Sequence, residues 1–306
     1  MIAYINTLPN AFSLGLIWAI VALGIFISYK VLDIPDLTVD GSLATGGAVC
    51  AVIINAGGGF WLGLLAGFIA GVLAGLLTGL LHTFLGIPPI LSGILTQLIL
   101  WSTNYKILGG QFEFIKTATH PVLISLYDPL GALWKMGIVV VLLVVAFYGF
   151  FGTQLGASIR ATGNNPRMSR AQGINTKFNI VLGLMLSNGI VALGGALYAQ
   201  YGGRAATDLG VGAIVVGLCS IVIGGAITKR ISSNFLIRMS GVVLGALIYQ
   251  LIFQTILSIE IGSFRFDDDL LKMLAAIVVI IFLGIPYIYK TYLPKRGKQK
   301  KKTVEE

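Results

Sequence analysis

Few residues of this chain have side chains that could take part in catalysis or bind a metal. His82 and His120 lie far apart, and Cys50 and Cys219 each lie inside an apolar stretch. Two separated histidines do not supply the clustered ligands of a metal site, and two cysteines are too few for a disulfide framework. The hydrolase signatures G-x-S-x-G and H-E-x-x-H are absent from the sequence. We therefore expect no metal, no cofactor and no catalytic residues, and we do not expect an enzyme.

A compact basic segment, RATGNNPRMSRAQGI (residues 160–174), differs sharply from the apolar sequence around it. Asn165 is a favoured N-cap residue, Pro166 suits the first helical position, and Gly173 suits the left-handed position after a helix end. These three residues predict a short helix over residues 166–172. A helix this short is marginal in water on its own, so we expect it to dock into a partner.

The charges of this segment also fit a docking role. Arg167 and Arg170 are adjacent at i, i+3 on the predicted helix, and residues 160–174 contain no acidic side chain. An alternative interpretation is an ordinary interfacial loop, in which the arginines only fix the orientation of the chain in a membrane.

Acidic and hydroxyl side chains beside apolar stretches form a second group of candidates. Charges in or next to membrane spans are costly and usually mark a transport pathway. The predicted pathway residues are Asp36, Thr38, Asp40, Ser42 and Asp208. The alternative for the aspartates is a simple capping role at helix starts that are exposed to water.

These candidates lie in an overwhelmingly apolar chain of 306 residues. Hydrophobic residues make up 56% and charged residues 11%, whereas soluble domains carry about 25% charged residues. A membrane-spanning helix needs about 20 apolar residues to cross a hydrocarbon core of roughly 30 Å. We therefore predict an all-α polytopic membrane protein with about nine transmembrane segments, in a range of eight to ten. The segments cover residues 10–29, 41–59, 60–81, 84–105, 136–153, 178–203, 209–228, 239–259 and 273–289.

The distribution of basic residues predicts the orientation of these segments. Residues 160–177, 228–238 and the tail are basic, and the residues from 290 to 302 hold seven of the 21 Lys and Arg. The positive-inside rule places all three zones in the cytoplasm, with the N-terminus outside and the C-terminus inside. Residues 30–40 fit less well, because they carry three aspartates and one lysine. Eight full spans plus a re-entrant or broken element at this place is the alternative. Residues 1–290 are then one transmembrane domain, with a cytoplasmic segment at 160–177, and residues 291–306 are a basic cytoplasmic tail.

Glycines at four-residue spacing predict how one helix packs. The stretch from Phe60 to Leu81 places glycine at positions 63, 67, 71, 75 and 79. Small residues at this spacing allow helix backbones to approach closely in lipid. The row drifts around a straight helix, so we expect Gly63, Gly67, Gly71, Gly75 and Gly79 to contact several neighbours rather than one. Gln97 and Asn104 lie in the next segment, and they could line a pore or bond between helices; we expect interhelical bonding.

A weak internal similarity indicates an inverted repeat. The stretch DLTVDG (residues 36–41) is similar to DLGVG (residues 208–212), and an Ala-Leu-Gly triplet precedes each of them. In the predicted topology the two units cross the membrane in opposite directions. Broken helices that meet near a transport site are typical of inverted repeats in transporters.

The basic segment and the aspartate segment resemble a known family. ATGNNPRMSRAQGI resembles the cytoplasmic coupling segment of the ABC-importer permeases that include the branched-chain amino acid and ribose permeases. Gly163, Asn164, Gly173 and Ile174 match its pattern, whereas Met168 and Ser169 stand near positions where alanines are usual. DIPDLTVDGS (residues 33–42) resembles the stretch at the end of that family's first span. The resemblance covers about residues 10–290, and the front part is similar to a branch linked to aromatic amino acid uptake.

The resemblance implies a function and a set of partners. The chain would be the pore-forming subunit of a binding-protein-dependent ABC importer that moves a small organic solute, such as an amino acid, across the bacterial inner membrane. Its partners would be cytoplasmic ATPase subunits, an extracytoplasmic solute-binding protein, a second permease copy or sister permease, and membrane lipid, but no nucleic acid. The ATPase-coupling residues would be Gly163, Asn164, Asn165, Pro166, Arg167, Arg170, Gly173 and Ile174. ATP would be bound by the partner, because the phosphate-loop motif G-x-x-x-x-G-K-[ST] is absent from this sequence.

Two other functions are also compatible with some features of the sequence. An ion-coupled secondary transporter also fits an inverted repeat and membrane aspartates, but such a carrier does not need a capped basic helix for docking an ATPase. An intramembrane enzyme has only the acidic residues 267–269 in its favour, and these form a single patch without a second.

Overall fold

The computed structural model describes residues 2–117, 119–228, 234–257, 277 and 280, and the predicted run at 273–289 and the tail lie outside these ranges except for those last two residues. Ten helices follow one another along the described chain. They are α1 (Ile2–Phe26), α2 (Thr38–Asn55), α3 (Gly59–Thr83), α4 (Pro89–Leu108), α5 (Pro129–Gly152), α6 (Gln154–Asn164), α7 (Pro166–Ala171), α8 (Thr176–Gly202), α9 (Ala213–Thr228) and α10 (Phe235–Leu257). A π-helical turn, η1 (Ile27–Val31), continues α1. The strands β1 (Phe112–Phe114) and β2 (Arg204–Ala206) pair in antiparallel register.

Six helices of the described chain are long and apolar enough to cross a membrane, namely α1 with η1, α2, α3, α5, α8 and α10. Eight of the nine predicted runs contain one helix each, but α4 carries several polar residues and α9 has only 16 residues. The all-α polytopic class is therefore confirmed, with a small two-stranded sheet that hydropathy did not predict.

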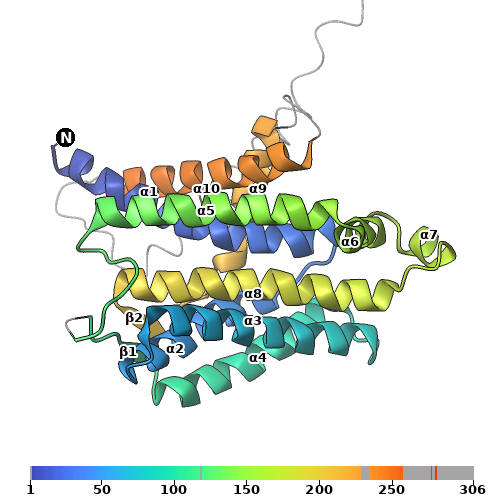
Figure 1. Cartoon of the computed structure of the whole chain (residues 1–306), viewed down its shortest axis with the longest axis horizontal. Helices are drawn as coiled ribbons and strands as arrows, with labels where there is room; N and C mark the ends of the chain where they lie inside the picture. The colour runs from blue at the N-terminus through green and yellow to red at the C-terminus, as the bar shows by residue number, and fades with distance from the viewer. Residues whose placement is uncertain (1, 118, 229–233, 258–276, 278–279, 281–306) are drawn as a thin grey trace, which may run out of the picture.

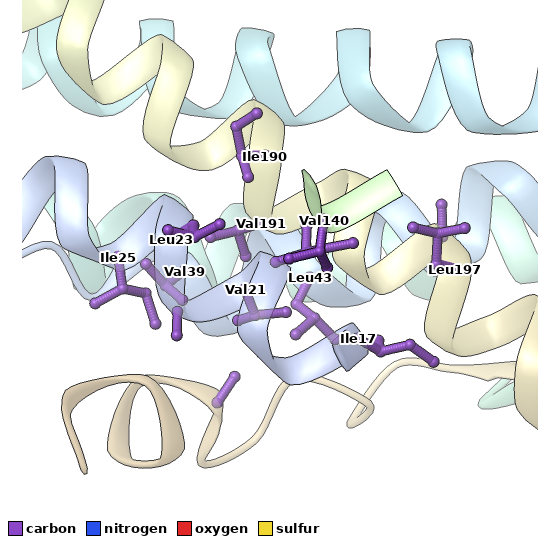
Figure 2. Close-up of a cluster of buried hydrophobic side chains, with 14 of the residues drawn as sticks. Ile17, Val21, Leu23, Ile25, Val39, Leu43, Val140, Ile190, Val191 and Leu197 are labelled. Atoms are coloured by element: carbon purple, nitrogen blue, oxygen red, sulfur yellow. The ribbon is translucent and has the colours of Figure 1, made fainter. Parts of the chain in front are cut away.

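The long helices run side by side along the longest axis of the molecule (Figure 1). α6 and α7 protrude at one end of the bundle, and β1 and β2 lie at the other end. α8 packs against α1, α2 and α3. The core between these helices consists of aliphatic side chains such as Val21, Leu43 and Val191, which belong to one buried cluster (Figure 2).

The glycine row of α3 contacts two helices. Gly63 packs against Cys50 of α2, and Gly67 lies between α2 and α8. Gly71, Gly75 and Gly79 all face α8. The glycine row therefore follows one partner, α8, over a longer stretch than we expected from its drift around α3. Rows of every fourth residue are inclined to the helix axis, so a partner that crosses at an angle can follow them.

The chain breaks between α1 and α2. After η1, Asp33 has a left-handed backbone (φ 56°), which is uncommon for a residue other than glycine. Pro35 follows, and α2 begins at Thr38, whose hydroxyl lies against that of Thr78, five residues before the last residue of α3. The connection from η1 to α2 at residues 32–37 is therefore non-helical.

Candidate solute pathway and coupling segment

Asp36 lies at the start of α2 and joins it to α8. Its carboxylate accepts a hydrogen bond from the backbone N–H of Thr38 at 2.9 Å and one from Nδ2 of Asn188 at 2.7 Å. Oδ1 of Asn188 in turn accepts a hydrogen bond from the Ser42 hydroxyl at 2.7 Å. All these side chains are buried. Asp36 and Ser42 therefore help hold two helices together, and Asp36 also caps α2.

Thr38 belongs to a second buried chain of hydroxyl groups. Its Oγ1 lies 2.7 Å from Oγ1 of Thr78 in α3, and the Thr78 hydroxyl lies 2.9 Å from Oγ1 of Thr96 in α4. This chain links the first turn of α2 to two further helices. Three of the five predicted pathway residues, Asp36, Thr38 and Ser42, thus lie in buried hydrogen-bond networks at the start of α2.

Asp40 occupies a different environment. Its carboxylate accepts hydrogen bonds from the backbone N–H groups of Ile214 at 3.0 Å and Gly212 at 3.2 Å, so it caps the start of α9. A carboxylate at this position is stabilised by the unpaired N–H groups and the dipole of the helix. Gly210 lies so close to Asp40 that a methyl group there would overlap the Asp40 carbonyl. The two similar segments, 36–41 and 208–212, are therefore in direct contact, whereas Asp208 itself is exposed.

A cavity of about 300 Å³ lies beside Asp40. Its wall is formed by the start of α2, by one face of α4, and by the connection from β2 to α9. The lining residues are Asp40, Gly41, Ile94, Gln97, Leu98, Trp101, Asn104, Thr207 and Val211. Trp101 and Thr207 were missed from the sequence. The helical spacing of Gln97, Trp101 and Asn104 (i, i+4, i+7) was the available signal for a common face.

Asn104 does not have the role that its sequence position predicted. It is fully buried, yet neither Nδ2 nor Oδ1 has a hydrogen-bond partner within the described ranges. The expectation of interhelical bonding is therefore wrong for Asn104. Asn104 is instead one of the residues that line the cavity, as is Gln97, although its two amide atoms are themselves buried.

The basic segment forms the short helix that the sequence predicted, one residue shorter at its end. The Asn165 side chain accepts a hydrogen bond from the backbone N–H of Met168 at 3.0 Å, and Pro166 is the first helical residue. Gly173 has φ 81°, and the N–H of Ile174 donates to the carbonyl of Ser169 at 3.0 Å, which closes the end of α7. Capping at both ends is therefore confirmed.

The outer surface of α7 is basic and partly apolar. Arg167 and Arg170 are exposed, and Met168 is 60% exposed. The helix projects from the end of the bundle opposite to the small sheet (Figure 1). α7 therefore has an exposed face that is accessible to another molecule.

α6 fixes the base of this projecting helix to the bundle. The Asn179 side chain of α8 donates to Oγ1 of Thr162 at 2.9 Å, and the Arg160 guanidinium lies 5.6 Å from the ring centre of Phe235 in α10. Gly163 packs directly on the backbone of Val31, where a methyl group would overlap the Val31 carbonyl. The end of α6 therefore touches the end of η1, just before the break that leads to Asp36.

Comparison with known proteins gives a consistent result. The sequence profile of the family described as "Branched-chain amino acid transport system / permease component" matches residues 7–283. The chain is 35% identical over 270 residues to a tyrosine transport system permease protein of Clostridioides difficile, covering 88% of each chain. It is 33% identical over 287 residues to an uncharacterized protein of Rickettsia prowazekii, covering 91% of this chain and 97% of that one. It is 26% identical over 249 residues to an autoinducer 2 import system permease protein of Salmonella paratyphi B, covering 80% and 68%. No solved structure shows a significant match.

Proposed function

Since the chain belongs to the family of branched-chain amino acid transport system permease components, we propose that it forms the membrane pore of a binding-protein-dependent ABC importer for an amino acid. The observation that carries this proposal is α7, a helix of six residues with a cap at each end and two exposed arginines. A helix so short gains little stability alone, and its caps and projection from the bundle suit docking to another subunit.

The projecting helix α7 also suggests that ATP is bound by a separate subunit. We propose that a separate cytoplasmic ATPase receives α7 in a groove and binds ATP, because this sequence lacks the phosphate-loop motif. The coupling surface would comprise Gly163, Asn164, Asn165, Pro166, Arg167, Arg170, Gly173 and Ile174. Movement of the ATPase would then act on α6 and, through Gly163, on the end of η1.

The charge distribution supports an orientation in the bacterial inner membrane. Among the described residues, the end of the bundle with α6 and α7 carries six basic side chains and the end with the sheet carries four. The six are Lys30, Arg160, Arg167, Arg170, Lys177 and Arg238, and the four are Lys106, Lys116, Lys135 and Arg204. By the positive-inside rule α7 is cytoplasmic, the N-terminus is outside and the C-terminus is inside. Nine transmembrane segments, with the last at 273–289, satisfy this arrangement.

Two observations bear on the identity of the solute. One relative is named a tyrosine transport system permease protein, and the cavity beside Asp40 is bordered by Trp101. We propose tyrosine or a similar aromatic amino acid as the solute, delivered by an extracytoplasmic binding protein. The pore would form between this chain and a second permease copy or a sister permease.

The test of the coupling surface is a double charge reversal, Arg167→Glu with Arg170→Glu. The variant is expected to insert and unfold like the wild type but to lose its ATPase subunit on gentle purification, and to lose ATP-driven uptake of L-tyrosine in proteoliposomes. The matched control is Lys116→Glu with Arg204→Glu, which reverses two exposed charges at the opposite end of the bundle. Full ATP-driven uptake by the first variant would contradict the coupling role, and uptake by the permease alone under an ion gradient would support a secondary transporter instead.

A further inference from the structure

One residue that lines the cavity beside Asp40 is Asn104, whose side-chain amide has no hydrogen-bond partner among the described residues. Asn104 is fully buried, and both polar atoms of its side chain are without a hydrogen-bond partner in the described part of the chain. Burying an amide without a partner is unfavourable, and buried polar groups in native proteins are nearly always hydrogen-bonded. An unpartnered amide on a residue that lines a cavity therefore points to a bound molecule that accepts a hydrogen bond from Nδ2 of Asn104.

Asp40 adds a negative charge with remaining capacity to accept hydrogen bonds. Each carboxylate oxygen accepts one backbone N–H, from Gly212 or Ile214. A carboxylate oxygen has two lone-pair directions, so each can accept one more hydrogen bond. Asp40 is only partly buried and borders the cavity. A ligand ammonium group there would gain a charge-assisted hydrogen bond.

The remaining wall of the cavity is apolar and aromatic. Trp101 lies on α4 between Gln97 and Asn104, and Leu98 and Val211 complete this side. Gln97 and Asn104 are seven positions apart, which corresponds to about 10 Å along the helix at 1.5 Å per residue. The cavity volume of about 300 Å³ lies at the lower end of the roughly 300–1,000 Å³ found for small-molecule sites. One amino acid with a large side chain suits this length and volume better than a peptide.

We infer that this cavity is a solute-binding site within the membrane domain, and that it takes a zwitterionic amino acid with an aromatic or large apolar side chain. Asp40 accepts from the α-ammonium group, the amide of Asn104 donates to the carboxylate, and Trp101 packs against the side chain of the solute. An aromatic ring of the solute can stack on the indole in the offset or edge-to-face geometry that such rings prefer. This inference rests on the proposed function and names the place where the permease recognises its solute.

The test is Asn104→Leu, which removes the amide and nearly preserves the shape of the side chain. Binding of radiolabelled L-tyrosine is measured on the full-length permease with its ATPase subunits in lipid nanodiscs, and ATP-driven uptake is measured in proteoliposomes. We expect binding and uptake each to fall by about tenfold or more, because a good hydrogen bond to a charged group corresponds to a factor of this size. We expect the unfolding temperature to stay equal or rise, since the substitution removes an unpartnered polar group.

The matched control is Thr103→Val at the neighbouring, exposed position of α4, where, within the described ranges, the hydroxyl bonds only to the Ile99 carbonyl of its own helix. Its binding and uptake should equal those of the wild type. A second measurement uses ligands instead of variants. Tyramine, which lacks the carboxylate, should compete equally well on the wild type and on Asn104→Leu, whereas L-tyrosine should compete well only on the wild type.

Two outcomes separate this inference from the proposed function. Wild-type uptake by Asn104→Leu would overturn the solute site, while the proposed importer would still stand if uptake depended on ATP. Loss of uptake with an unchanged preference for L-tyrosine over tyramine would also overturn the site, because the amide would then act on the fold or on coupling. Failure of the importer itself would appear earlier, as uptake that does not depend on the ATPase subunit in the wild type.

Discussion

Removal of both caps of α7 should separate the integrity of the fold from its coupling to an ATPase. The perturbation is Asn165→Ala with Gly173→Ala. The first substitution removes the oxygen that accepts from Met168 N–H at 3.0 Å. The second places a Cβ atom on a residue with φ 81°, in the left-handed region that L side chains avoid. Both residues are exposed, so no core contact is lost.

The magnitude follows from the two local terms. Loss of an Asn N-cap costs about 1 kcal/mol, and a left-handed alanine costs about 1–2 kcal/mol. The sum of about 2–3 kcal/mol corresponds to a factor of roughly 30 to 140 in an equilibrium constant. α7 has only six residues and little stability of its own. If docking requires the formed helix, the apparent dissociation constant of the ATPase rises by up to this factor, because only the competent fraction binds.

The assay is titration of the purified ATPase subunit onto the permease in nanodiscs, with the melting temperature of the permease measured in parallel. A rescue variant, Asn165→Ser with Gly173→Asn, changes the same positions but keeps an N-cap acceptor and a residue that tolerates the left-handed region. It should bind close to wild type. Wild-type affinity in the double alanine variant would refute the reasoning that α7 docks as a capped helix. Equal loss in the rescue variant would show instead that the side chains themselves are read by the partner.

Two further predictions concern the packing that holds the pathway in place. In Gly75→Ala the new methyl group would overlap the Leu184 carbonyl of α8, which should destabilise the protein by about 1–3 kcal/mol. Gly149→Ala, in open space on α5, should instead stabilise it by up to about 1 kcal/mol. Thermal unfolding in detergent measures both effects, and equal effects would contradict the packing of the glycine row. Asn188→Leu leaves Asp36 without its side-chain donor and should lower the free energy of unfolding by about 1–3 kcal/mol for each polar group left unpaired. Denaturant unfolding measures this change. Replacing Asp36 by Leu as well should restore part of the lost stability, whereas a further loss of stability would contradict the pairing.

Features that depend on neighbours in sequence were predictable. The caps of α7 are bonds between residues three to five apart, so Asn165, Pro166 and Gly173 specify them without reference to the rest of the chain. The positions of the apolar helices follow equally directly from the length of apolar sequence that a bilayer requires. The non-helical connection before α2 contains Pro35, which disfavours a helical conformation of the residue before it.

Features that depend on distant residues were not predictable from the chain alone. Asp36 and Asn188 are 152 positions apart and become partners only because α2 packs against α8. The two strands of the small sheet are similarly distant in sequence, and each has only three residues. Asn104 is an example in which a contact expected from the sequence is absent from the described structure. Polar residues in apolar helices usually bond to a neighbouring helix, and only the arrangement of α2, α4 and the β2–α9 connection reveals that this residue lines a cavity and that its amide has no partner among the described residues.

The distance along the chain between the coupling segment and the cavity is short. Gly163 at the end of α6 lies on Val31, and Leu32 packs against Gly183 of α8. Asp40 lies nine positions after Val31, and the residues from Thr38 onward are helical. A displacement of α6 must therefore move the segment 32–37, be absorbed by its backbone, or break the bonds of Asp36 to α8. Because Asp36 caps the same first turns of α2 that carry Asp40, a shift that reaches Asp36 also changes the wall of the cavity and the cap of α9. The broken segment thus offers the most direct physical connection in the described structure between the surface that would receive the ATPase and the site that would hold the solute.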